Sequence, residues 1–194
     1  ADHGKTATAK KRETAMKEIR EMTMGELAAF VCSHLQKNGI DVVLSGGGCV
    51  AIYSEGRYVS YDLDFVENIS SGRRKLKKVL AAIGFEEEAR YFTHPETQYL
   101  LEFPAGPLAV GDEAPQKIVV LSFETGELLA LSPTDCVKDR LAAYFHWNDQ
   151  QCLEQALLVA SASDIDITEI ERWSLKEGNE KKFLYFSDLL KDRQ

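Results

Sequence analysis

The sequence predicts a mixed α/β (α+β) protein: a core that combines strands with helices, followed by a helical C-terminal lobe. Between residues 40 and 131, short apolar or alternating runs bounded by glycine and proline surround a single amphipathic helical pattern. After residue 132, apolar residues recur only at helical spacing. The chain has 194 residues, 44% of them hydrophobic, so it is long enough for one such core and a small lobe.

Caps and breakers define the first elements. Thr23 and Glu26 form a capping-box pattern that begins a helix, and Asn38-Gly39 ends it. A second helix begins after Ser70-Ser71-Gly72, with apolar residues at helical spacing. The other expected elements of the core are a short helix at 49–54 and strands at 40–44, 59–66, 85–93, 98–103, 117–123 and 126–132.

The C-terminal part reads differently. Ser132-Pro133-Thr134-Asp135 is a helix start, with proline in the first turn and an aspartate at the third helical position. Three more helices are expected around 153–160, 167–173 and 183–190. The predicted division of the chain is an N-terminal tail or leading helix at 1–22, a core at 23–132 and a helical lobe at 133–194.

Composition excludes several classes of protein. The formal net charge is −8, so nucleic acid is not a bulk partner and any contact with it is local. No apolar run is long enough to cross a membrane, and the N-terminus carries no secretory signal. The four cysteines are widely spaced without a CxxC pair, which indicates reduced thiols in a cytoplasmic protein rather than a zinc site.

The segment "SGGGCVAIYSEGRYVSYDLDF", residues 45–65, carries the chemistry. Side chains alternate along a strand, so Asp62 and Asp64 lie on one face and suit a divalent cation with oxygen ligands. Gly46, Gly47 and Gly48 follow a buried strand at the start of a helix, where backbone N–H groups favour an anion. A phosphate beside a carboxylate-held metal indicates phosphoryl or nucleotidyl transfer.

Each half of this pattern also has an ordinary interpretation. A run of glycines is commonly a turn, and an Asp-x-Asp pair is commonly a solvated strand edge. Asp164 and Asp166 form a second such pair, but they lie between helices with no glycine turn before them, which predicts a helix N-cap.

Together, the two halves resemble the nucleotidyltransferase superfamily of the DNA polymerase β type. The pattern Leu44-Ser45-Gly46-Gly47-Gly48-Cys49-Val50, then Arg57, then Ser60-Tyr61-Asp62-Leu63-Asp64-Phe65 is similar to that of bacterial abortive-infection-type toxins and related nucleotidyltransferase-like proteins. The resemblance implies a nucleotidyltransferase-type mixed sheet flanked by helices. It further implies a nucleoside triphosphate substrate, ATP among the possibilities, and one or two Mg²⁺ ions held by Asp62 and Asp64.

The resemblance also implies roles for residues further along. Gly46, Gly47 and Gly48 would cradle phosphates, although Gly48 stands where the family usually has Ser or Thr, so that triphosphate binding is either weaker or left to backbone N–H groups alone. A third carboxylate acts as general base, and Glu102 in "YLLEFP" is its candidate, ahead of Asp112 and Glu113 in a loop.

In the similar toxins a later helix carries a lysine that reaches the triphosphate. Lys138 is the candidate here, with Arg140 as its competitor, and Asp149 resembles a later acidic position. Each also has a structural interpretation: solvated helix residues for the two bases, and a helix cap for Asp149.

The acceptor is left open by the sequence. The basic cluster Arg73, Arg74, Lys75, Lys77 and Lys78 is either a solvated helix face or a contact for a phosphate-bearing acceptor such as tRNA. The expected activity is transfer of a nucleotidyl group to a hydroxyl of tRNA or protein, toxin-like, with a possible antitoxin partner. The alternatives are a small-molecule, antibiotic-type nucleotidyltransferase and a non-catalytic relative that binds nucleotide or a partner.

Overall fold

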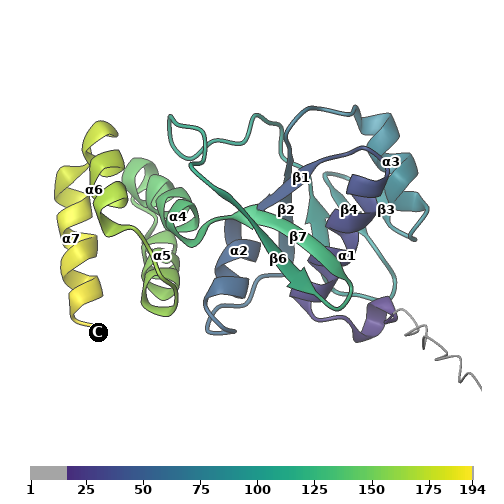
Figure 1. Cartoon of the computed structure of the whole chain (residues 1–194), viewed down its shortest axis with the longest axis horizontal. Helices are drawn as coiled ribbons and strands as arrows, with labels where there is room; N and C mark the ends of the chain where they lie inside the picture. Colours follow the sequence, from purple (N-terminus) through teal and green to yellow (C-terminus); the bar gives the residue numbers. More distant parts are fainter. Residues whose placement is uncertain (1–16, 194) are drawn as a thin grey trace, which may run out of the picture.

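A computed structural model describes residues 17–193 of the chain (Figure 1). The expected N-terminal tail therefore lies mostly outside the described residues. After a short 3₁₀ turn at Ile19–Glu21, the described residues form seven strands and seven α-helices. No helix among residues 17–193 is long and apolar enough to cross a membrane. All four cysteines are buried and free.

Seven strands form one mixed sheet in the order β3-β4-β5-β2-β1-β7-β6. Its centre is antiparallel β1 and β2, which pair in parallel with β7 and β5 respectively. The outer pairs are antiparallel hairpins. The strands are β1 (Val42–Ser45), β2 (Asp62–Glu67), β3 (Glu86–Glu88), β4 (Tyr91–Thr93), β5 (Leu100–Glu102), β6 (Ile118–Phe123) and β7 (Gly126–Leu131).

Three helices belong to the sheet region. α1 (Met24–Lys37) packs against β1, β6 and β7, and α3 (Arg73–Ala81) packs beside α1 and β3. α2 (Gly46–Tyr53) lies between the sheet and the C-terminal helices and contacts β2, α4 and α5 (Figure 1). The start of α2 therefore lies where the central strands and the helical region meet.

The C-terminal helices lie together at one end of the molecule (Figure 1). They are α4 (Pro133–Trp147), α5 (Gln150–Ala162), α6 (Ile167–Lys176) and α7 (Glu180–Lys191). The hydrophobic core is continuous through both regions, because buried residues of the sheet and of these four helices form one cluster. The division into core and lobe stays a prediction.

Most local predictions are confirmed. Thr23 and Glu26 form the capping box of α1, Ser132 caps α4 by accepting from the Asp135 N–H, and Asp166 caps α6. The differences are at boundaries. α2 begins at Gly46 rather than at residue 49, and β2 begins at Asp62 rather than at residue 59. The expected strand at 85–93 is a hairpin, turned at Ala89 with φ 55°.

Candidate active site

Three carboxylates come together on the two neighbouring parallel strands β2 and β5. Asp64 is the register partner of Glu102, and Asp62 is the partner of Leu100. Because side chains alternate along a strand, Asp62, Asp64 and Glu102 lie on one face, while Leu63 and Phe65 are fully buried on the other. All three predicted carboxylates thus share a single patch of the sheet.

The glycine turn lies against this patch. Gly46 begins α2 with φ +61°, a left-handed conformation that glycine adopts without strain. A side chain at Gly46 would overlap the carboxylate of Asp64. The glycine therefore serves two purposes: it permits the turn from β1 into α2, and it leaves space for Asp64 beside the backbone N–H groups that begin the helix.

The next two glycines face different surroundings. A Cβ at Gly47 would lie 3.1 Å from the hydroxyl oxygen of Ser60, on the side of β2. A Cβ at Gly48 would lie 3.2 Å from methyl groups of both Leu44 and Leu63, within the core. A Ser or Thr at position 48 would direct its Cβ toward these leucines, so this position offers a ligand its backbone only.

A cavity of about 310 Å³ opens over Gly46 and Asp64. We call it the glycine–carboxylate cavity. Its walls come from β1, α2, β2, α4 and the segment after β5. Its lining residues are Ser45, Gly46, Asp64, Val66, Pro104, Ala105, Pro107, Leu108, Ala109, Asp139 and Arg140.

Negative charge is concentrated around Asp64. Burial raises the pKa of this carboxyl, and the neighbouring charge of Glu102 raises it further. Arg140 opposes the rise, whereas Asp62 and Asp139 add to it, and the resulting pKa of Asp64 is about 6. A carboxylate held among like charges is stabilised by a bound cation, so the electrostatics of the cavity favour one.

Glu102 already has one cationic neighbour. The Arg90 Nε lies 3.5 Å from Glu102 Oε1, and the Arg90 side chain is 68% exposed. An exposed ion pair of this length is weak and leaves the carboxylate able to exchange partners. The Glu102 carboxylate is therefore held only weakly by Arg90.

Helix α4 contributes two residues to the cavity. Arg140 donates to Asp139 from Nε at 3.0 Å and from Nη2 at 2.5 Å. Its guanidinium also contacts the Gln155 amide oxygen at 3.4 Å. The sequence analysis considered Arg140 only as an alternative to Lys138 and did not predict Asp139. Nothing in the local sequence pattern indicates that Asp139 and Arg140 line a site.

Lys138 is placed elsewhere, which corrects its expected contact with the triphosphate. Its side chain is fully buried, and its Nζ lies 3.0 Å from Glu169 Oε1 and 3.4 Å from Asp135 Oδ1. A lysine held between two carboxylates in the interior links α4 to α6 and does not reach the glycine–carboxylate cavity.

The other acidic candidates also have structural contacts. Asp149 caps α5 by accepting from the N–H groups of Gln151 and Cys152, as its ordinary interpretation predicted. Asp112 and Glu113, the fallback general bases, lie in the loop between β5 and β6. Glu113 pairs with Arg172 and Lys176 of α6 rather than with the sheet carboxylates.

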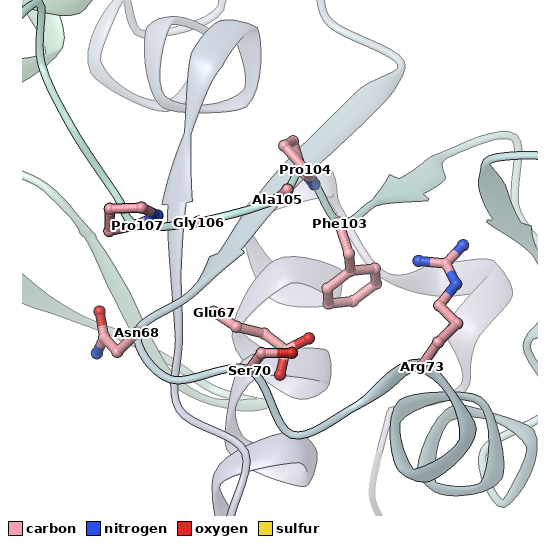
Figure 2. A pocket seen from close by; sticks show the side chains of 9 residues that line it. All are labelled: Glu67, Asn68, Ser70, Arg73, Phe103, Pro104, Ala105, Gly106 and Pro107. Atoms are coloured by element: carbon pink, nitrogen blue, oxygen red, sulfur yellow. The ribbon is translucent and has the colours of Figure 1, made fainter.

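Figure 2 shows the residues that line a second cavity, of about 520 Å³. Both cavities are lined by Pro104, Ala105 and Pro107, so one short segment separates them. The second cavity is lined by Glu67, Asn68, Ser70, Arg73, Phe103 and the segment Pro104–Pro107.

The basic cluster on α3 is partly neutralised. Arg73 and Lys77 both pair with Glu87 of β3, at 2.7 and 3.3 Å. Arg74 and Lys78 are exposed. The cluster therefore presents less positive charge than its sequence indicates.

Within residues 17–193, no three His, Cys, Asp or Glu side chains are arranged as a metal site. Mg²⁺ needs fewer, because it is commonly held by one or two carboxylates together with substrate phosphates. Asp62 and Asp64 are oxygen donors on one face, and burial, followed by the charge of Glu102, raises the pKa of Asp64. The residues present fit a magnesium ion that binds with its nucleotide.

Comparison with solved structures identifies the architecture. A nucleotidyltransferase-like protein from Paracoccidioides brasiliensis, an antigenic protein, superposes with a TM-score of 0.56 at 12% identity, over 84% of this chain and 92% of that one. The chain has a nucleotidyltransferase-type fold. The antibiotic-resistance factor ANT(2'')-Ia matches with TM-scores of 0.47 in solution and 0.43 in its crystal complex with adenylyl-2''-tobramycin, at 13% identity in both.

These matches span nearly the whole of each compared chain: 95% of ANT(2'')-Ia in solution and 94% in its crystal complex. No protein-family model and no curated protein sequence matches the chain. The fold shared with the Paracoccidioides brasiliensis protein agrees with the fold class predicted from the glycine and aspartate motifs.

Proposed function

We propose that this protein transfers a nucleotidyl group from a nucleoside triphosphate to a hydroxyl acceptor. The observation that carries the proposal is the direct apposition of Gly46 and Asp64, with Glu102 in register beside Asp64. Gly46 and Asp64 line one cavity, and Asp62 and Glu102 lie beside Asp64 on the same face of the sheet, which supports a cation site and a proton acceptor next to the helix N–H groups. Nucleotidyl transfer needs these three components together.

Each residue has a defined part. Backbone N–H groups of Gly46, Gly47 and Gly48 at the start of α2 bind phosphate oxygens, assisted by the helix dipole. Asp62 and Asp64 would hold Mg²⁺, which supplies charge neutralisation at the phosphates. Glu102 accepts the proton of the acceptor hydroxyl as its oxygen attacks the α-phosphorus, and pyrophosphate leaves.

Arg140 replaces Lys138 as the basic residue of the lobe in this proposal. It lines the same cavity as Gly46 and Asp64, and its pairing with Asp139 fixes the guanidinium in position. A phosphate would be bound by the Nη N–H groups that the pair with Asp139 leaves available.

Incorporation of radiolabel from each of the four NTPs, with Mg²⁺, into total tRNA and into cell lysate tests the proposal. Asp62→Asn/Asp64→Asn should abolish labelling. Asp164→Asn/Asp166→Asn is the matched control, because it alters the other Asp-x-Asp pair and Asn caps a helix as well as Asp. Labelling that survives in the first double variant would disprove the assigned site.

The acceptor we favour is a hydroxyl of tRNA or protein, which also fits a toxin controlled by an antitoxin. Exposed Arg74 and Lys78 on α3 are the residues that support an RNA acceptor. Charge reversal at both should weaken RNA binding and reduce its dependence on salt. Unchanged RNA binding would leave α3 as a solvated face.

A small-molecule acceptor is the second candidate, and the second cavity favours it. At about 520 Å³ it has the volume of a small-molecule site, and it shares three lining residues with the glycine–carboxylate cavity. RNase and protease treatment of the labelled product separates the cases, because label on a small molecule resists both. Glu102 faces the same side as Asp64, which argues against a non-catalytic relative.

A further inference from the structure

Residues 103–117 connect β5 to β6, and we call this segment the strap. Its first half forms walls of both cavities, through Pro104, Ala105 and Pro107. Figure 2 shows these three residues at the second cavity. Leu108 and Ala109 line the glycine–carboxylate cavity but not the second cavity. The position of the strap therefore sets the shape of the cavity that contains Asp64.

The second half of the strap is attached to α6. The indole Nε1 of Trp173 donates to the Val110 carbonyl at 3.1 Å, and both residues are fully buried. Glu177, just after α6, accepts from the Asp112 N–H at 2.9 Å. Val110 and Glu113 close a small loop, in which the Val110 N–H donates to the Glu113 carbonyl at 2.7 Å.

Glu113 is the charged anchor of this loop. Its two carboxylate oxygens receive Arg172 Nη1 and Nη2 at 3.2 and 2.7 Å, and Lys176 Nζ lies 2.6 Å from Oε1. Hydrogen bonds from Arg172 and Lys176 hold the pKa of Glu113 down at about 2. Glu113 is therefore ionised at neutral pH and fixed by two side chains of one helix.

A series of ion pairs through the interior connects Arg172 of α6 with the other end of the strap. Arg172 also donates to Glu169 at 2.6 Å, and Glu169 accepts from Lys138 at 3.0 Å. Lys138 contacts Asp135, whose Oδ2 accepts from the N–H of Lys117 at the far end of the strap. One charged network therefore holds the strap at Glu113 and at Lys117, across α6 and α4.

We propose that this network positions the strap, and that Glu113 is a positioning residue for nucleotide binding in the glycine–carboxylate cavity. The inference rests on the proposed function for its ligand. Glu113 does not line the cavity, so it acts through the strap residues Leu108 and Ala109. The network also explains why Lys138 is buried: it carries the positive charge that joins Asp135 to Glu169.

Glu113→Gln tests the inference, with Glu154→Gln as the matched control. Glu154 also forms a bidentate pair, with Arg193 at 2.9 and 2.6 Å, far along the chain from the strap. Amide hydrogen exchange without nucleotide should accelerate at Val110 and Asp112 in Glu113→Gln but not in Glu154→Gln, on the order of tenfold. Lys176→Met, which removes an exposed partner, should act in the same direction and more weakly.

Nucleotide affinity is measured on the same proteins, with the four magnesium NTPs. Glu113→Gln should weaken the tightest of them on the order of fivefold, while Glu154→Gln leaves it unchanged. Unchanged exchange at Val110 and Asp112 would overturn the role of Glu113 in fixing the strap. Faster exchange with unaltered affinity would overturn its role in nucleotide binding. A wild-type protein that binds no NTP would instead refute the proposed function, while the exchange data would still test the anchoring.

Discussion

Gly46 lies so close to Asp64 that no side chain fits between them. One residue begins α2, and the other lies in the middle of β2, in register with Ser45 of β1. The antiparallel pairing of β1 and β2 brings the end of one strand beside the carboxylate of the other. The glycine turn and the aspartate pair are therefore two parts of a single site.

Gly46→Ala should both destabilise the protein and impair nucleotide binding. Alanine at φ +61° costs about 1 kcal/mol, and the overlap with Asp64 adds about 1–3 kcal/mol as the carboxylate is displaced. Urea denaturation and NTP titration measure the two effects.

Gly56→Ala is the control for backbone strain. Gly56 has φ +81°, and nothing lies within 4 Å of a Cβ built there. Gly56→Ala should therefore lose only the stability that positive φ costs an alanine, and it should bind nucleotide normally. Equal losses of stability in the two variants, with nucleotide binding intact in both, would show that Asp64 does not depend on Gly46.

Magnesium-dependent nucleotide affinity should rise with pH through about 6. The pKa of Asp64 is raised to about 6 by burial and then by Glu102, so the carboxyl is protonated below that pH and ionised above it. Only the ionised form binds a cation. Titration calorimetry between pH 5 and 8 would show the midpoint.

Glu102→Gln tests whether the pH dependence of nucleotide affinity comes from the titration of Asp64. Loss of the Glu102 charge lowers the pKa of Asp64, so the midpoint should move to lower pH. An affinity that is flat across this range in wild type, or a midpoint unmoved by Glu102→Gln, would contradict the assignment of Asp64 as the titrating ligand.

The sequence predicted the parts of the site that are local. Strand alternation placed Asp62 and Asp64 on one face, and the glycines marked the start of a helix. Glu102 was predicted because the apolar run around it indicates a strand. Its place beside Asp64 depends on the pairing of β5 with β2, two strands that are distant in sequence. Caps at Thr23, Ser132 and Asp166 were equally local and are confirmed.

The residues from α4 could not be assigned in this way. Lys138 and Arg140 lie two positions apart on one helix, so they project in different directions, and the local sequence does not show which one faces the sheet. The structure buries Lys138 between Asp135 and Glu169 and leaves Arg140 at the cavity. The partner that decides the matter, Glu169, lies on another helix.

Asp64→Asn should make the protein more stable at neutral pH while removing magnesium-dependent binding. Because the folded-state pKa of Asp64 is raised, the native state binds more protons than the unfolded state between about pH 4 and 6, and stability falls as pH rises through that range. Asparagine carries no charge, so it removes both the cost of burying the Asp64 carboxylate and its repulsion by Glu102. Thermal melts of both proteins at pH 5 and 7.5 should diverge at the higher pH; melts that coincide at both would show that the charge of Asp64 costs no stability.

Lys138→Met should destabilise the protein, in contrast to Arg140→Gln. Methionine fills a similar volume but leaves Asp135 and Glu169 without their shared cation, and breaking a buried pair from one side costs about 3–5 kcal/mol. Arg140→Gln instead removes a guanidinium at the cavity, so it should weaken NTP binding with a smaller loss of stability. Urea denaturation and NTP titration on both variants check the contrast. If Lys138→Met kept full stability and lost nucleotide binding, Lys138 would act in the site after all, because a residue that joins α4 to α6 through buried charges cannot be removed without loss of stability.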